Sequence, residues 1–60
     1  MDEYLTTKQI AHILNVNQVT VRRWIQNGIL PAIYLGTDSK EYRVARTDFE
    51  NFIESRKVKI

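Results

Sequence analysis

The sequence predicts an α+β domain that is mostly helical, with two N-terminal helices, a β-hairpin and a C-terminal helix. Three observations carry this prediction. Apolar residues recur with a helical period in residues 10–14, 21–25 and 49–53. Side-chain character alternates in residues 32–35 and 41–44, as in strands, and turn-forming residues separate these segments. The chain has 60 residues, shows no linker or repeat, and is expected to form one domain over residues 1–60.

The first helix is expected to begin at Thr6, since Gln9 follows at the spacing of a capping box. In that arrangement each of the two side chains bonds the backbone amide of the other residue. The apolar residues of this segment fall on one helical face, which we expect to pack in the core: Ile10, Ala11, Ile13 and Leu14. His12 points away from that face. Tyr4 is expected to pack as an apolar staple ahead of the helix.

A short turn separates the first helix from the second, which should run from Gln18 to Asn27. Asn17 is a suitable N-cap for the second helix, and Val16 can fold back before it as a hydrophobic anchor. Gly28 suits the left-handed position that follows a helix end, and Pro31 prevents continuation. The core-facing stripe of this helix is expected to consist of Val21, Trp24 and Ile25.

The opposite face of the second helix is the candidate functional surface. Its members are mostly polar or cationic: Val19, Arg22, Arg23 and Gln26, with Gln18 and Thr20 near the helix start. Arginine can pair with phosphates or guanine edges, glutamine and threonine can bond bases or backbone, and valine can contact a thymine methyl. A solvated helix face with one exposed valine is the alternative. The capped helix pair and its short turn favour a reader of duplex DNA.

After Pro31 the pattern predicts an antiparallel hairpin, or wing, over residues 32–44 with a turn at Gly36–Lys40. The expected packed face contains alternate residues of the two strands: Ile33, Leu35, Tyr42 and Val44. Arg43 should then project from the other face beside Glu41, and Lys40 supplies a cation at the tip. Tyr34 is expected to cover the sheet together with Tyr42.

A third helix is expected from about Arg46 to Arg56, with Phe49, Phe52 and Ile53 at core spacing. Acidic residues in its first turn (Asp48 and Glu50) and basic residues in its last turn (Arg56 and Lys57) would suit the helix dipole. Residues 58–60 should form a frayed tail. The helix-turn-helix would thus cover about residues 6–27, the wing about 32–44 and the closing helix about 46–57.

Composition excludes several classes of site. The chain has no cysteine, which rules out disulfides and thiolate metal sites. His12 has no second ligand at metal spacing, and no nucleophile, base and orienting group occur together, so we expect no metal, no cofactor and no enzymatic activity. The longest apolar run is too short to span a membrane and the N-terminus is acidic, which favours a cytoplasmic, nucleoid-associated protein. The net charge is only +2, but cations concentrate in the middle of the chain.

Several segments together resemble the excisionase-type, MerR-like winged helix-turn-helix DNA-binding domains. The resemblance covers residues 4 to about 57, on these motifs: Leu5-Thr6-Thr7-Lys8-Gln9-Ile10-Ala11, Thr20-Val21-Arg22-Arg23-Trp24-Ile25, Gly28-Ile29-Leu30-Pro31-Ala32, Tyr42-Arg43-Val44 and Asp48-Phe49-Glu50-Asn51-Phe52. It implies a bacterial or phage protein whose second helix enters the major groove while the wing lies along the backbone or minor groove. It also implies that Arg23 meets phosphate or base and that Arg43 meets the backbone. The wing loop is longer than is usual in the family and carries Asp38 and Glu41 where relatives often have cations.

Combining both arguments, we expect DNA contacts from nine residues: Gln18, Val19, Thr20, Arg22, Arg23, Gln26, Lys40, Arg43 and Arg46. The chain ends soon after the third helix, without an evident sensor or dimerisation segment. The leading expectation is therefore an excisionase, or recombination directionality factor, that binds repeated sites side by side, bends DNA and assists an integrase. A small transcription regulator with the same DNA surface is the first alternative. A module that docks on an acidic protein is the second.

Overall fold

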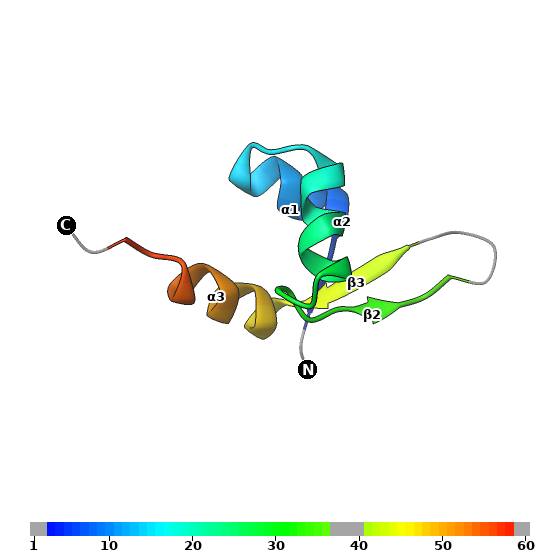
Figure 1. Cartoon of the computed structure of the whole chain (residues 1–60). Coiled ribbons are helices and arrows are strands. Elements are labelled where there is room, and N and C mark those ends of the chain that lie inside the picture. The colour runs from blue at the N-terminus through cyan, green and yellow to red at the C-terminus, as the bar shows by residue number, and fades with distance from the viewer. Residues whose placement is uncertain (1–2, 37–40, 59–60) are drawn as a thin grey trace.

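The computed structural model describes residues 3–36 and 41–58 of the chain. In these ranges the chain forms β1 (Tyr4–Thr6), α1 (Thr7–Leu14), α2 (Gln18–Gln26), β2 (Ile33–Tyr34), β3 (Tyr42–Ala45) and α3 (Arg46–Ser55). Figure 1 shows α1 and α2 standing together over the sheet, with the β2–β3 hairpin extending to one side and α3 to the other. The predicted α+β, mostly helical winged helix-turn-helix fold is confirmed.

Strand β1 is an element that the sequence analysis missed. It pairs antiparallel with β3, so the sheet has the order β1-β3-β2, and Leu5 lies opposite Val44. Both of these side chains are buried. Tyr4 belongs to the same strand and remains 50% exposed, so it does not pack as the expected staple before α1. Three residues are too few to show an alternating pattern, and only the partner strand reveals them as a strand.

Local hydrogen bonds satisfy backbone groups at both ends of α1. The capping box is confirmed, because the Gln9 amide donates to Thr6 Oγ1 at 3.0 Å and the Thr6 amide donates to Gln9 Oε1 at 2.9 Å. At the other end Asn15 adopts the left-handed conformation with φ 56°, and the Val16 amide donates to the Ala11 carbonyl at 2.9 Å. The Val16 side chain is 37% exposed and is not among the residues that form the core or pack against it, so its expected role as an apolar anchor stays a prediction.

Helix α2 begins and ends close to the predicted limits. Asn17 is its N-cap residue, although its side chain makes no capping hydrogen bond. The helix ends at Gln26, one residue earlier than expected, and Gly28 has the predicted left-handed backbone with φ 75°. The amides of Gly28 and Ile29 donate to the carbonyls of Ile25 and Trp24 at 3.0 and 2.8 Å. These two bonds form a Schellman motif, which turns the chain sharply into the segment leading to β2.

The core lies where the helices meet the sheet. Its buried apolar residues come from every element except β2: Leu5, Ile10, Ala11, Val21, Leu30, Val44, Phe49 and Phe52. Trp24, Ile25 and Leu14 pack against this cluster as predicted. Ile13 does not, since it is 57% exposed. The inward arc of α1 is centred on Thr7, Ile10, Ala11 and Leu14, and Ile13 lies about 110° from its centre at helical spacing.

The hairpin is confirmed, but its predicted packed face is only partly right. Ile33 lies opposite Arg43 and Tyr34 lies opposite Tyr42, whose ring centroid is 5.2 Å away. Val44 is fully buried, whereas Ile33 and Leu35 are 48% and 49% exposed. A change of one residue in register exchanges the two faces of a strand, and the alternating pattern cannot reveal the register. Residues 37–40, which include Lys40, lie outside the described residues.

Helix α3 confirms the predicted closing helix. Phe49 and Phe52 are buried, Ile53 packs beside them, and the Phe52 ring lies 5.1 Å from that of Trp24. Asp48 is in the first turn, but Glu50 lies beyond it and Arg56 is the C-cap residue, so the expected pairing of charges with the helix dipole is only partly realised. Val58 is 83% exposed, and residues 59–60 are outside the described range.

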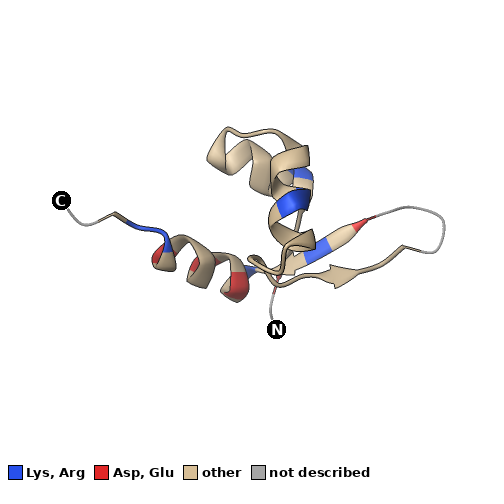
Figure 2. Cartoon of the chain, viewed as in Figure 1, with Lys and Arg blue, Asp and Glu red and all other residues tan. Residues whose placement is uncertain are grey.

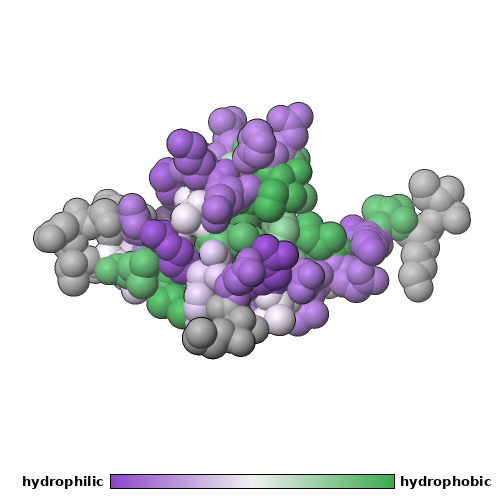
Figure 3. Space-filling model, turned by 180° about the vertical axis from the view of Figure 1, so that it is seen from behind, coloured by the Kyte–Doolittle hydropathy of each residue, from purple (hydrophilic) through white to green (hydrophobic). Residues whose placement is uncertain are grey.

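Seen from behind, apolar side chains reach the surface where the helix pair meets α3 (Figure 3). An apolar groove there is lined by residues of α1 and α3 that include Ile13, Leu14 and Ile53. In the described part of the chain no helix is both long and apolar enough to cross a membrane.

Candidate nucleic-acid interface

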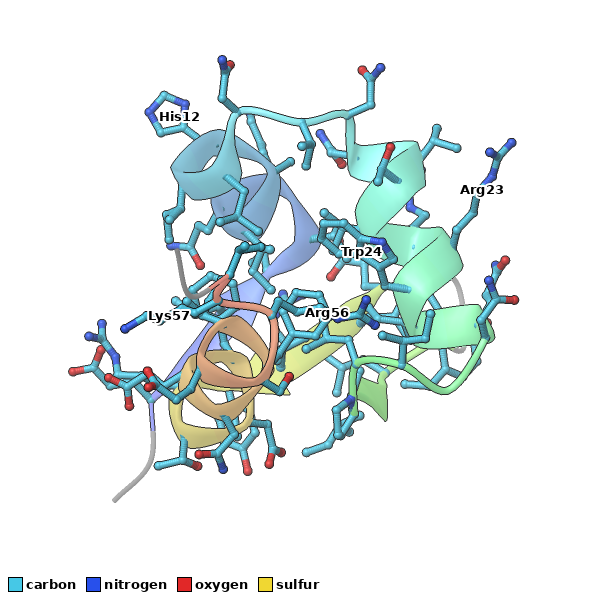
Figure 4. All side chains as sticks on the ribbon, turned by 60° about the vertical axis from the view of Figure 1, so that its left-hand side comes forward. His12, Arg23, Trp24, Arg56 and Lys57 are labelled. Carbon is cyan, nitrogen blue, oxygen red and sulfur yellow. The ribbon has the colours of Figure 1, made fainter. Side chains whose placement is uncertain are left out.

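The outward face of α2 presents the residues that the sequence analysis selected. Arg23 and Gln26 are exposed and Val19 is 52% exposed, while Gln18, Thr20 and Arg22 are half-buried. Figure 4 shows Arg23 pointing away from the body of the domain, whereas Trp24 turns towards the interior. Arg23 has no hydrogen bond or ion pair with any described residue. Its guanidinium is therefore available to a ligand.

A polar groove of about 270 Å³ adjoins this face. It lies between the first turn of α1, the first turn of α2 and the start of β3, and its lining consists of Thr6, Thr7, Lys8, Gln18, Arg22, Glu41, Tyr42 and Arg43. The groove thus unites Arg22 and Arg43, which the sequence predicted separately as DNA contacts. It also adds Lys8, for which the sequence held no signal, because the groove exists only once three distant segments have met.

The two arginines of this groove are held by neighbours on their own elements. Arg22 Nη2 donates to Gln18 Oε1 at 3.4 Å along α2. Arg43 Nη1 donates to the Tyr42 carbonyl at 3.0 Å, and Arg43 Nη2 lies 3.1 Å from Glu41 Oε2. The predicted position of Arg43 beside Glu41 is confirmed. Each guanidinium is oriented within the groove and still has N–H groups for a further acceptor.

Arg46 lies apart from this groove. It is the first residue of α3, and its Nη2 forms an ion pair with Glu3 Oε2 at 2.9 Å. Its backbone amide also donates to the Glu3 carbonyl at 2.8 Å. The structure thus does not bring Arg46 together with Arg22 and Arg43, and a contact of Arg46 with DNA stays a prediction. The same holds for Lys40, which is not among the described residues.

Charge is distributed unevenly over the fold. Figure 2 shows basic residues on α2 and β3, with one acidic residue just before β3, while α3 carries acidic residues along its length and basic residues at its two ends. The acidic residues of α3 are Asp48, Glu50 and Glu54. An anionic ligand is therefore attracted to the side formed by α2 and β3 rather than to the outer side of α3.

Other kinds of site have little support in the structure. Among residues 3–36 and 41–58, no cluster of three or more His, Asp or Glu side chains could hold a metal ion. His12 is exposed on α1 (Figure 4). The buried side-chain nitrogen and oxygen atoms in these ranges all have hydrogen-bond partners, so no orphaned polar group marks a second ligand site there.

Comparison with known proteins identifies the class. A family model described as a helix-turn-helix domain matches residues 4–57, and the chain therefore belongs to the helix-turn-helix domain family. Over 52 residues the chain is 38% identical to the transcriptional repressor DcmR of Methylorubrum extorquens. That match covers 87% of this chain and 19% of the repressor, so the chain spans about a fifth of the length of its relative. No solved structure matches the chain.

Membership of this family makes the chain a DNA-binding helix-turn-helix domain.

Proposed function

We propose that this domain binds duplex DNA sequence-specifically, with α2 in the major groove and the β2–β3 hairpin against the sugar-phosphate backbone. One observation carries the proposal. The groove that holds Lys8 and Arg43 is also lined by Arg22 of α2, which is next in sequence to the exposed Arg23. An α-helix fits the major groove of B-form DNA, and cations beside such a helix fall near the phosphates that border the groove.

The roles proposed for the α2 residues follow from their exposure. Arg23 and Gln26 are exposed and are assigned to base edges or to the phosphates beside them, and the exposed Val19 is assigned to a thymine methyl. Arg22 and Arg43 are assigned to backbone phosphates. Gln18 and Thr20 are half-buried near the helix start and are assigned to polar backbone contacts. Lys40 and Arg46 are assigned to further phosphates.

Replacing Arg23 tests the proposal directly. R23A should weaken binding to a duplex selected from a random pool by about tenfold or more, because one base or phosphate contact is lost. Fluorescence anisotropy over a series of salt concentrations measures this, and for the wild type the logarithm of affinity should fall linearly with the logarithm of salt. K57A is the matched control, because it also removes one cation but lies beyond α3. Equal affinities for R23A and K57A, or salt-independent binding by the wild type, would contradict the proposal.

For the biological role we propose transcription regulation first. The supporting observation is the 38% identity to a transcriptional repressor over 87% of this chain, which corresponds to 19% of the repressor. This role requires only a specific site that overlaps a promoter. A DNase I footprint confined to one such site, with little bending of the duplex, is the expected result.

An excisionase is the second candidate. The resemblance of residues 4–57 to excisionase-type domains favours this role. Exposed apolar side chains outside α2, namely Ile13, Ile33 and Leu35, also favour it, because neighbouring copies or an integrase could cover them. Phased protection over direct repeats, with a bend that grows as copies are added, would favour this role over the first. An integrase gene beside the coding sequence would point the same way.

A further inference from the structure

We propose that Glu41 acts as an internal counter-charge that holds Arg43 back from a DNA backbone phosphate and so lowers the affinity of the groove for DNA. The inference deepens the proposed function and rests on it. It concerns one carboxylate and one guanidinium that face the same groove as Arg22 and Lys8.

The Arg43 side chain contacts both residues that precede it in the chain, Tyr42 and Glu41. Nη2 lies 3.1 Å from Glu41 Oε2, and Nη1 donates to the Tyr42 carbonyl at 3.0 Å. The side chains of Arg43 and Glu41 are 31% and 53% exposed, so water and ions reach the pair. An ion pair in such a position is weak and exchanges readily with another anion. A phosphate therefore competes with Glu41 for the same guanidinium.

The rest of the groove explains why this competition affects DNA binding. Glu41 is the acidic side chain among the described lining residues, and Lys8, Arg22 and Arg43 are the cations. A phosphate attracted by these three cations approaches the Glu41 carboxylate as well and is repelled by it. Binding then requires either that Arg43 exchanges Glu41 for phosphate or that the phosphate contact of Arg43 is not made. Both outcomes reduce affinity relative to a groove without the carboxylate.

The backbone at Glu41 serves a separate structural purpose. Its carbonyl accepts from the Leu35 amide at 2.8 Å and so joins the two sides of the hairpin. This bond does not involve the carboxylate. The E41Q substitution keeps the bond and the side-chain shape while it removes the charge, so it separates the electrostatic role from the fold.

The experiment compares the affinity of E41Q and wild type for one duplex over a series of salt concentrations. E41Q should bind about threefold to tenfold more tightly at low salt, because the ion pair no longer has to be broken and the carboxylate no longer repels the phosphate. If the released Arg43 binds one more phosphate, the slope of log affinity against log salt should be steeper by about 0.9 for E41Q than for the wild type. E54Q is the matched control, since Glu54 also pairs with a basic residue, Lys57, at 2.9 Å, but on α3 outside the groove. E54Q should change affinity by less than about twofold.

The Arg43 variants decide whether the effect runs through the proposed pair. In an R43Q background the gain from E41Q should be clearly smaller than in the wild type, because only the repulsion between the carboxylate and the phosphate remains to be removed. An undiminished gain without Arg43 would overturn the proposal, as would an E41Q affinity equal to or below that of the wild type. Urea unfolding of each variant checks that the fold is kept. If the wild type itself showed no salt-dependent duplex binding, the proposed function would fail first and this inference with it.

Discussion

Arg22 and Arg23 are adjacent in the sequence but lie in different surroundings. Arg22 is half-buried beside Gln18 and lines the polar groove, whereas Arg23 is exposed and projects from the domain (Figure 4). One step along a helix rotates a side chain by about 100°, which is enough to separate a residue at the edge of the packed region from one in solvent. The two arginines are therefore suited to different parts of a duplex.

Ile10 and Ile13 offer a matched test of burial on a single helix. Ile10 is fully buried and Ile13 is 57% exposed. I10V should lower the free energy of unfolding by about 1 kcal/mol, since it leaves a small cavity in the core, whereas I13V should change it by less than about 0.5 kcal/mol. Urea denaturation followed by circular dichroism measures both. A similar loss of free energy of unfolding in I10V and I13V would show that Ile13 is packed in the core.

The ends of the helices are the clearest link between sequence and structure at the scale of elements. A residue with left-handed backbone follows the end of each of α1 and α2, namely Asn15 after α1 and Gly28 after α2. These two residue types adopt this conformation most readily. The turn between the helices and the exit from α2 therefore follow from local chemistry, and together they set the angle at which α2 is presented.

Gly28 provides a test of this argument. A Cβ atom at this position meets nothing within 4 Å, so any cost of substitution arises from the backbone conformation alone. G28A should destabilise the domain by about 1 kcal/mol, and G28N should cost less, because asparagine tolerates positive φ better than alanine. The midpoints of urea denaturation rank the three proteins. A ranking with alanine above asparagine would contradict the left-handed conformation at Gly28.

At the scale of the whole molecule, α3 is joined to the helix-turn-helix through aromatic contacts. The ring centroid of Phe52 lies 5.1 Å from that of Trp24, and the Arg56 guanidinium carbon lies over the Phe52 ring at 5.3 Å from its centroid. Trp24 is the single tryptophan of the chain, so its fluorescence reports on this contact. Because α3 shares one core with α1, α2 and the sheet, we expect all elements to unfold together.

That expectation can be checked with F52L. Replacing Phe52 should lower stability by about 1 kcal/mol and shift the unfolding curves from Trp24 fluorescence and from circular dichroism by the same amount of urea. E50Q, on the exposed side of the same helix, should leave both midpoints nearly unchanged. Curves that separate, with helix signal lost before the tryptophan signal changes, would show α3 to be an independent unit.

The same molecule shows where reading the sequence succeeds and where it fails. The capping box at Thr6 and Gln9, the stripe of Val21, Trp24 and Ile25, and the aromatic face of α3 were all predicted and are all observed. Strand β1 was missed, and the hairpin register placed Ile33 and Leu35 outside rather than inside. The burial of Leu5 and Leu30 was not foreseen either, because neither residue belongs to a periodic pattern.

By itself the sequence determined the three helices, the inward faces of α2 and α3 and the polar face of α2, because these depend on bonds and spacings within a few residues. The tertiary structure alone decided which strands pair, how the first amide of α3 is satisfied by the Glu3 carbonyl, and how Lys8, Arg22, Arg43 and Glu41 come to share one groove. The physical reason is that these features arise between segments far apart in the chain, which meet only when the common core has formed and no local interaction specifies their partners.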